Sequence, residues 1–431
     1  MENLKSKIQE QGYNIPYSEN LSVLCAPITV SGKVAPNRIA IQPMEGCDGT
    51  ADGAFGELTH RRYERFAKSG AGLIWAEACA VVNEGRANPR QLFLTEKNLD
   101  SFKYEVEFMR ETAMKENGIN PVIILQATHS GRYSKPQGTP APLIAYNKPI
   151  FEKDNPIDAS HILSDDYLKA LEEKFGLTAK LAEQAGFDGV DIKCCHGYLM
   201  SELMGAHVRK GEYGGSYENR TRLYFNSIAQ AKQNTGKDFI VTSRMNAYDG
   251  FPYPYGFGVT EEKGLTPVLD EPLQVVKTLK EKFDFELLDI TIGNPYVNPH
   301  VNRPFNHGPY ESPEAPLTGV ERMMKCVGKI QQENPDMVIM GSGFSYMGKE
   351  SENVAAGAVE NGVCKIAGFG RQAFAYPDFA KDMLSGGAKQ EKCCIACGKC
   401  SELMRAGTVA GCVIRDSETY MPYYKQYVLK K

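Results

Sequence analysis

The most regular feature of the sequence is a series of short apolar runs, each followed by a helix-like stretch. Most of the runs are continuous rather than alternating, as expected of parallel strands that are covered on both faces. Eight such units predict an α/β fold, a (β/α)₈ TIM barrel with enlarged loops, and a doubly wound open sheet is the alternative. The runs span residues 38–44, 72–78, 121–126, 189–193, 239–244, 286–292, 337–341 and 363–368.

The segments between the runs carry helix signals and long loops. Ser164 is predicted to cap a helix whose apolar face contains Leu168, Leu171, Phe175 and Ala182. Three long loops, each after a predicted strand, are rich in Pro, Gly, Asn and Tyr and are expected to shape a substrate pocket. The alternative is that their aromatic side chains only anchor the loops. These loops span residues 131–163, 246–270 and 293–316.

Composition narrows the function classes. The 431 residues include 49 Lys or Arg and 53 Asp or Glu, so the charge gives no reason to expect nucleic acid or an anionic membrane as a partner. No apolar run is long enough to cross a membrane, and the N-terminus lacks a secretory pattern, so we expect a cytoplasmic protein. Five of the twelve cysteines fall between Cys393 and Cys412, which favours a metal site over disulfides. We therefore expect a barrel with an N-terminal arm over residues 1–386 and a cysteine-rich extension over 387–431.

One strand end concentrates polar chemistry. The run that contains Val190 and Ile192 leads directly into Lys193, His196 and Tyr198. A cation, an imidazole and a phenol at the carboxyl end of a barrel strand are suited to polarising a carbonyl and delivering a proton.

Other strand ends carry short motifs that are weak singly but ordered along the chain. They include Gln42-Pro-Met-Glu-Gly46, Tyr213-Gly-Gly-Ser-Tyr-Glu-Asn-Arg220 and glycine-rich turns at 341–343 and 368–371. Glycine-rich turns after the last two strands present backbone N–H groups to a phosphate, and Arg371 adds a charge-assisted contact.

In this order the motifs resemble the old yellow enzyme family of FMN-dependent ene-reductases, and more closely its NADH:flavin oxidoreductase and 2,4-dienoyl-CoA reductase branch. The resemblance implies that FMN N5 delivers hydride to the substrate β-carbon and that Tyr198 donates a proton to the α-carbon. It also implies that Gln126 bonds the isoalloxazine edge and that Arg244 lies near its N1–O2 side. The FMN-binding residues that it implies are Pro43, Met44, Glu45, Ala78, Gln126, Arg244, Gly341, Ser342, Gly343, Gly370 and Arg371.

The sequence departs from the family at the pair that binds the substrate carbonyl. The family places two His, or His and Asn, three residues apart, and this chain has Lys193 and His196. We expect the Lys193 ammonium to stabilise the developing enolate or to hold a substrate carboxylate. The alternative is that Lys193 contacts only the flavin or Asp191. Cys194 and Cys195 are expected to be buried fillers.

The tail contains the pattern C-x2-C-x2-C-x11-C, formed by Cys394, Cys397, Cys400 and Cys412. Its three close thiolates and one distant thiolate suit a compact cluster, and the pattern resembles the [4Fe–4S] segment of the dienoyl-CoA reductase branch. That branch has three residues between its second and third ligands rather than two, so Cys393 is a spare candidate ligand. A Zn(Cys)₄ site is the alternative.

These features predict an FMN- and [4Fe–4S]-dependent ene-reductase that acts on a C=C bond beside a carbonyl or carboxylate. No Gly-x-Gly-x-x-Gly follows a strand, and we expect no FAD or NAD(P) domain, so electrons come from NAD(P)H or from a reductase, ferredoxin or flavodoxin. An amine dehydrogenase and an electron-transfer subunit are the alternatives. Enoyl-CoA, steroid or bile acid, tetrapyrrole and phenolic acrylate substrates all suit a wide aromatic pocket.

Overall fold

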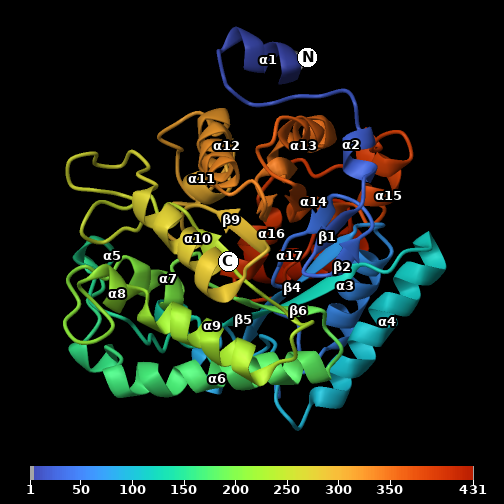
Figure 1. Ribbon diagram of the computed structural model, residues 1–431. Coiled ribbons are helices and arrows are strands. Elements are labelled where there is room, and N and C mark those ends of the chain that lie inside the picture. Colours follow the sequence, from blue (N-terminus) through green and yellow to red (C-terminus); the bar gives the residue numbers. More distant parts are fainter. Residues whose placement is uncertain (1–3, 431) are drawn as a thin grey trace.

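The computed structural model describes residues 4–430 and contains one large parallel sheet that wraps into a barrel (Figure 1). The strand order is β7-β6-β5-β4-β3-β11-β10-β9-β8. Only Ser243 separates β7 from β8, which pair with β6 and β9 respectively and therefore act as the two halves of one closing strand. The predicted (β/α)₈ barrel is confirmed, and the open-sheet alternative is wrong. The barrel strands are β3 (Ile39–Ile41), β4 (Leu73–Ala80), β5 (Val122–Thr128), β6 (Gly189–Ile192), β7 (Ile240–Thr242), β8 (Arg244–Asn246), β9 (Leu287–Thr291), β10 (Val338–Gly341) and β11 (Ile366–Phe369).

Each predicted apolar run overlaps one of these strands, because residues on both faces of the barrel wall are buried. All eight residues of β4 and all seven of β5 are buried. An inner apolar cluster around Trp75 fills the barrel interior, and a larger outer cluster lies between strands and helices. An antiparallel hairpin of β1 (Ile28–Val30) and β2 (Lys33–Ala35) contributes Val30 and Ala35 to the inner cluster. The hairpin covers the barrel at the amino ends of its strands. The opposite end, at the carboxyl ends of the strands, stays open and holds a cavity.

Helices surround the barrel, and α6 and α9 pack side by side along one edge (Figure 1). Ser164 caps α6 as predicted, its hydroxyl accepting from the Tyr167 N–H at 3.1 Å, and Leu168, Leu171 and Phe175 are buried. The helices are α1 (Leu4–Glu10), α2 (Ser22–Cys25), α3 (Glu57–Ala67), α4 (Leu99–Asn117), α5 (Pro149–Glu152), α6 (Asp165–Gln184), α7 (Leu199–Met204), α8 (Tyr217–Arg220), α9 (Arg222–Asn234), α10 (Asp270–Phe283), α11 (Pro299–Asn302), α12 (Pro316–Glu333), α13 (Ser351–Glu360), α14 (Arg371–Ala375), α15 (Phe379–Leu384), α16 (Lys399–Arg405) and α17 (Ser417–Tyr424). Short 3₁₀ segments are η1 (Asn83–Gly85), η2 (Gly131–Tyr133), η3 (Ala159–His161), η4 (Phe344–Glu350) and η5 (Gln390–Lys392), and η6 (Lys425–Leu429) is a π-helical turn.

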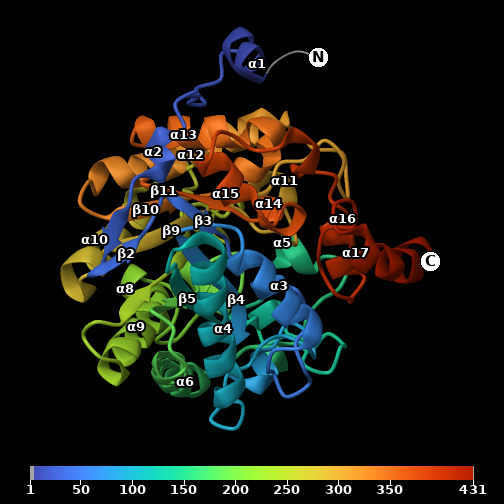
Figure 2. The same cartoon turned by 90° about the vertical axis from the view of Figure 1, so that its right-hand side faces the viewer.

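The two ends of the chain lie on the periphery. Helix α1 stands apart from the barrel in both views, although the Leu4 N–H donates to Glu350 Oε1 at 3.2 Å (Figures 1 and 2). Helices α16 and α17 project from the side of the barrel (Figure 2). The tail is held to the barrel by the Ala410 N–H, which donates to the Gly46 carbonyl at 2.7 Å, and by an ion pair of Arg61 with Asp416 at 2.8 Å. Residues 1–3 of the predicted barrel segment (1–386) and residue 431 of the predicted extension (387–431) lie outside the described residues.

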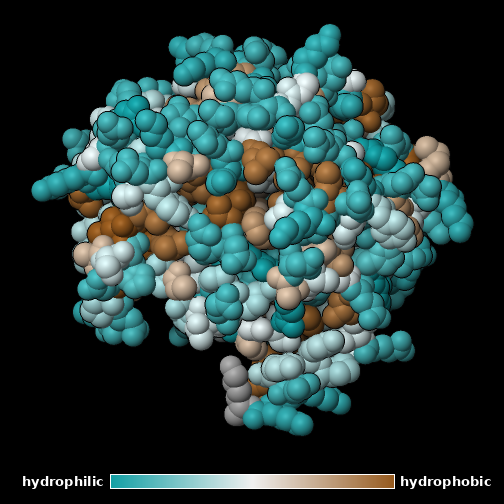
Figure 3. Space-filling view, turned by 90° about the horizontal axis from the view of Figure 1, so that it is seen from below, coloured by the Kyte–Doolittle hydropathy of each residue, from teal (hydrophilic) through white to brown (hydrophobic). Residues whose placement is uncertain are grey.

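The outer surface is mostly polar. The face in Figure 3 is largely hydrophilic, with hydrophobic side chains showing across its middle. Among residues 4–430, no helix combines the length and apolar character needed to cross a bilayer.

Candidate functional site

The main cavity lies at the carboxyl ends of the barrel strands. Its open volume is about 1110 Å³, part of it continuous with solvent. Of the residues predicted to be catalytic or to bind the cofactor, all except Gly341 line this cavity. Gly341 lies just behind it, and its carbonyl accepts from Gln42 Nε2 at 3.4 Å. The predicted residues in the lining are Pro43, Met44, Glu45, Ala78, Gln126, Lys193, His196, Tyr198, Arg244, Ser342, Gly343, Gly370 and Arg371.

Buried charges organise the inner end of the cavity. Asp191, at 0% exposure, accepts from Gln126 Nε2 at 2.7 Å, from Trp75 Nε1 at 2.8 Å and from the Arg244 N–H at 2.7 Å. Burial nevertheless raises the pKa of Asp191 to about 7. Arg244 Nε lies 2.9 Å from Asp289 Oδ2, so the strand-end cation is paired rather than free. These contacts fix the orientation of both Gln126 and Arg244 toward the cavity.

Lys193, His196 and Tyr198 meet on one wall, as the strand-end pattern predicts. Lys193 Nζ lies 4.0 Å from the centroid of the Tyr198 ring, a cation–π contact. Burial lowers the pKa of Lys193 and holds the pKa of His196 well below its usual range, so this imidazole is neutral. Burial holds the pKa of Tyr198 well above its usual range, so its phenol keeps the proton. The wall therefore presents one protonated phenol and one neutral imidazole.

Two tyrosines of the site lie in the long loops and were not predicted individually. The Tyr296 hydroxyl lies 2.8 Å from the Tyr198 hydroxyl, and its ring stacks on Tyr133 with centroids 3.9 Å apart. Tyr198 is 3% exposed whereas Tyr296 is 41% exposed, so the pair joins the cavity wall to solvent. The only sequence signal for them is the aromatic content of loops 131–163 and 293–316, which predicted pocket-shaping segments without naming residues.

Glu45 is a half-buried carboxyl on the same cavity. Its Oε1 accepts from Asn88 Nδ2 at 3.1 Å, and among residues 4–430 it has no ion-pair partner. Burial raises the pKa of Glu45 to about 7, and the nearby Lys193 opposes that effect. The folded protein thus holds a proton on Glu45 at pH values where the unfolded chain has released it.

Replacing Glu45 with Gln is therefore expected to stabilise the protein increasingly as the pH rises from 5 to 8. In that window the wild type loses stability, because the unfolded chain releases the Glu45 proton more readily than the folded protein does. The loss is complete above about pH 7. Urea unfolding of the FMN-free protein should show the advantage of the variant growing by about 1–3 kcal/mol across the window. Glu107→Gln, on the exposed side of α4, serves as the control and should show no such growth. An advantage for Glu45→Gln that does not change with pH would contradict this assignment.

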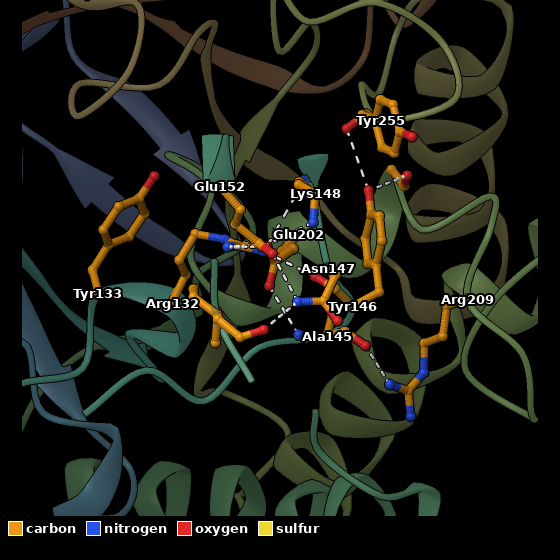
Figure 4. Close-up of polar contacts among 12 residues, drawn as sticks. Arg132, Tyr133, Ala145, Tyr146, Asn147, Lys148, Glu152, Glu202, Arg209 and Tyr255 are labelled. Carbon is orange, nitrogen blue, oxygen red and sulfur yellow. Dashed lines mark hydrogen bonds and ion pairs between the residues drawn. The ribbon is translucent and has the colours of Figure 1, made fainter. Parts of the chain in front are cut away.

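A second layer of buried charge supports the loop that carries Tyr133 (Figure 4). Arg132 lies 2.6 Å from Glu152 and 2.7 Å from Glu202, and Lys148 Nζ lies 4.0 Å from Glu202. Glu202 also accepts from the Ala145 N–H at 2.9 Å. These contacts tie loop 131–163 to helix α7 directly behind Tyr198.

Replacing Glu202 with Gln is expected to cost about 3–5 kcal/mol of unfolding free energy, because it leaves the buried charge of Arg132 undercompensated. Glu281→Gln is a matched control, since Glu281 pairs with Lys277 at 4.0 Å on the surface with 64% and 69% of the two side chains exposed. That control should change stability by less than about 0.5 kcal/mol. Urea unfolding of the two variants measures both values, and equal effects would show that the buried network contributes little.

The four tail cysteines of the predicted pattern line a second, smaller cavity. Cys394, Cys397, Cys400 and Cys412 all contribute to it, and none forms a disulfide. Cys393 does not line it and is instead buried, its Sγ accepting from Gln372 Nε2 at 3.4 Å.

The cysteine cavity adjoins the main cavity. Arg371, Phe374 and Cys400 line both. Within residues 4–430, no group of three or more His, Cys, Asp or Glu side chains is arranged to hold a single metal ion. Four cysteine side chains around one cavity are the donor set that both a [4Fe–4S] cluster and a Zn(Cys)₄ site use.

The glycine turns at the cavity fit a phosphate-bearing cofactor. Gly343 has φ +95°, a conformation that favours glycine, and a Cβ at Gly370 would lie 2.7 Å from Met44 Sδ. Both glycines line the cavity, so their backbones approach whatever occupies it. Two buried polar atoms of cavity residues, Gln42 Oε1 and His196 Nε2, have no partner among the described residues. A bound group with a phosphate and polar ring edges would satisfy this lining.

Comparisons with known proteins agree on the type of barrel. The sequence profile of the NADH:flavin oxidoreductase / NADH oxidase family matches residues 23–306. An NADPH dehydrogenase from Clostridium acetobutylicum is 27% identical over 278 residues, which cover 64% of this chain and 74% of that protein.

Solved structures extend the likeness in fold beyond the matched segment. The complex of 2-naphthoyl-CoA reductase with 2-naphthoyl-CoA superposes with a TM-score of 0.74 at 19% identity, covering 91% of this chain and 57% of that one. An old yellow enzyme homologue from Zymomonas mobilis gives 0.61 at 20% identity, covering 85% and 94%. The chain thus spans only a little over half of the reductase that it superposes on, and at these identities the likeness shows the fold.

Proposed function

Because the chain belongs to the NADH:flavin oxidoreductase / NADH oxidase family and so to the FMN-dependent oxidoreductases, we propose that it is an ene-reductase for a C=C bond conjugated to a carbonyl or carboxylate. The observation that carries this proposal is the buried Tyr198 phenol beside Lys193 and His196 on the cavity wall. Reduction of such a bond requires a proton donor and a group that stabilises negative charge on the carbonyl oxygen.

The cavity residues divide into a cofactor side and a substrate side. Gln126 and Arg244 would bind the ring of FMN, and Gly343, Gly370 and Arg371 would bind its phosphate. Bound FMN would supply the hydride for the β-carbon of the substrate. The Arg244 cation favours negative charge on the N1–O2 side of that ring, although Asp289 shares its charge.

On the substrate side, Tyr198 would give its proton to the α-carbon. Because Tyr296 hydrogen-bonds the same hydroxyl and is partly exposed, it would hold the phenol in place and connect it to solvent for reprotonation. His196, neutral and with a free buried Nε2, and the Lys193 ammonium would bind the carbonyl oxygen where negative charge develops.

Lys193→Met tests the substrate role of the ammonium. We expect the rate of reduction of an α,β-unsaturated acid to fall by roughly 10²–10³-fold, a loss typical of one removed oxyanion donor, with the FMN content unchanged. Stopped-flow oxidation of the reduced enzyme by cinnamate measures it. An unchanged rate with bound FMN would place Lys193 in contact with the cofactor or Asp191 only.

The tail cysteines are proposed to hold a [4Fe–4S] cluster that passes electrons from an external donor. Support comes from the shared lining residues of the two cavities, with Cys400 at their junction. The donor would be a reductase, ferredoxin or flavodoxin, or NAD(P)H acting directly on the main cavity. A cytoplasmic location accords with free thiols throughout the chain.

The substrate proposal is tested by a panel assay on the FMN-loaded, dithionite-reduced enzyme under anaerobic conditions. Cinnamate, cinnamoyl-CoA and cyclohexenone are offered, and the saturated products are identified by mass spectrometry with deuterium from the solvent at the α-carbon. Reduction of at least one conjugated compound supports the proposal. Reoxidation by none of them, with rapid exchange of electrons with a ferredoxin, would favour an electron-transfer subunit instead.

A further inference from the structure

Three arginines converge on a cavity between loop 293–316 and the tail. Arg303 follows α11, Arg371 begins α14 and Arg405 ends α16, and all three line this cavity. Arg303 and Arg371 line the main cavity as well. The cavity lined by the three arginines therefore adjoins the proposed active site. Its remaining wall is mixed, with apolar Pro299 and Phe305 beside polar His307, Ser401 and Glu402.

These arginines lack the partners that other arginines of the protein have. Arg132 lies between two carboxylates (Figure 4), and Arg220 pairs with Glu271. Over residues 4–430, no carboxylate lies within ion-pair distance of Arg303, Arg371 or Arg405, and the only side-chain partner of the three is the Ser401 hydroxyl, which accepts from Arg303 Nη1.

The acidic residue in the lining of this cavity does not neutralise them. Glu402 lines the same cavity, but its Oε2 accepts from the Tyr424 hydroxyl. Burial lowers the pKa of Arg303 most, and the charges of Arg371 and Arg405 lower it further, while Cys400 opposes this effect. The three guanidinium groups therefore repel one another. Converging unpaired guanidinium groups at a cavity are the arrangement that binds phosphate, and more than one negative charge is needed to compensate them.

We propose that Arg303 and Arg405 bind the diphosphate of a nucleotide-bearing ligand whose other end reaches the main cavity. The proposal rests on the proposed function, in which the phosphate of FMN occupies Arg371 and leaves the other two arginines to a second anion. Two sources carry this chemistry, a coenzyme A thioester as substrate and NAD(P)H as donor. ADP contains the group that they share and is therefore the probe.

The test is a calorimetric titration of ADP into the FMN-loaded protein. Arg303→Gln and Arg405→Gln are each expected to weaken ADP binding at least tenfold, and added salt should weaken binding more in the wild type than in the variants. Arg90→Gln, close to the tail through the Gly407 carbonyl but outside the cavity, is the matched control and should bind ADP like the wild type. FMN content is measured on every sample.

The outcomes separate this proposal from the one on which it rests. Tenfold weakening in both variants with full FMN content supports it, and competition of ADP with coenzyme A or with NADP⁺ then identifies the source. Equal ADP affinity in all proteins, or no ADP binding to the wild type at millimolar concentration, overturns it while leaving the ene-reductase assay valid. Loss of FMN in Arg303→Gln would also overturn it, because Arg303 would then belong to the cofactor phosphate.

Discussion

Tyr198→Phe is expected to slow the reduction of a conjugated double bond by roughly 10²–10⁴-fold, the usual contribution of a positioned proton donor. The substitution removes one hydroxyl and leaves the ring that Lys193 contacts at 4.0 Å. FMN should bind normally, and reduction of the enzyme by dithionite should be unaffected, because neither process takes a proton from Tyr198. Stopped-flow reoxidation of the reduced protein by the unsaturated compound measures the effect.

Tyr133→Phe is the matched control for this substitution. The Tyr133 hydroxyl accepts a hydrogen bond from Asn294 Nδ2 at 3.0 Å. The Tyr133 ring stacks on Tyr296, and Phe keeps that ring. We expect less than a fivefold change in rate for this variant. Equal reoxidation rates for Tyr198→Phe and the wild type would mean that another group delivers the proton.

Cys397→Ser is expected to remove most of the iron from the protein, because an alcohol at neutral pH is a poor replacement for a thiolate ligand. Electron transfer from a one-electron donor such as a ferredoxin should then be lost, while the FMN content stays near one per chain. Iron and flavin analysis after anaerobic purification, followed by reduction with ferredoxin, measures both effects.

Cys393→Ser tests whether Cys393, the neighbour of Cys394, is one of the cluster ligands. Cys393 is adjacent to Cys394 in the sequence but lies outside the cysteine cavity and contacts Gln372. Iron content should therefore survive this substitution. Loss of iron in Cys393→Ser but not in Cys394→Ser would show that Cys393, rather than Cys394, is the ligand.

The barrel could be predicted because its strands are buried on both faces and therefore appear as continuous apolar runs. Each of the eight runs overlaps a strand, and even the split of one strand at Ser243 falls inside a predicted run. The ends of the strands differ from the ends of the runs: β3 is only Ile39–Ile41, since the following residues leave the sheet to line the cavity.

The candidate site could be predicted where its residues sit at strand ends. Lys193 and His196 follow directly from that rule, because a barrel brings the carboxyl ends of its strands together, whereas Arg244 was expected there from the family resemblance. Tyr296 and Arg303 could not be predicted, since their loop has no periodic pattern and its path is set by contacts such as that of Arg303 with Ser401, about a hundred residues away in sequence. Long-range side-chain contacts of this kind leave no local signal.

We expect flavin and an iron–sulfur cluster to share one chain, and the absorption spectrum of the anaerobically purified protein is the measurement that would show both. With iron, sulfide and flavin analysis, we predict flavin bands over a broad iron–sulfur shoulder, with about four irons and one FMN per chain. Flavin without iron would leave the barrel as an ene-reductase and contradict the role of the tail. The absence of both chromophores after reconstitution would contradict the account as a whole.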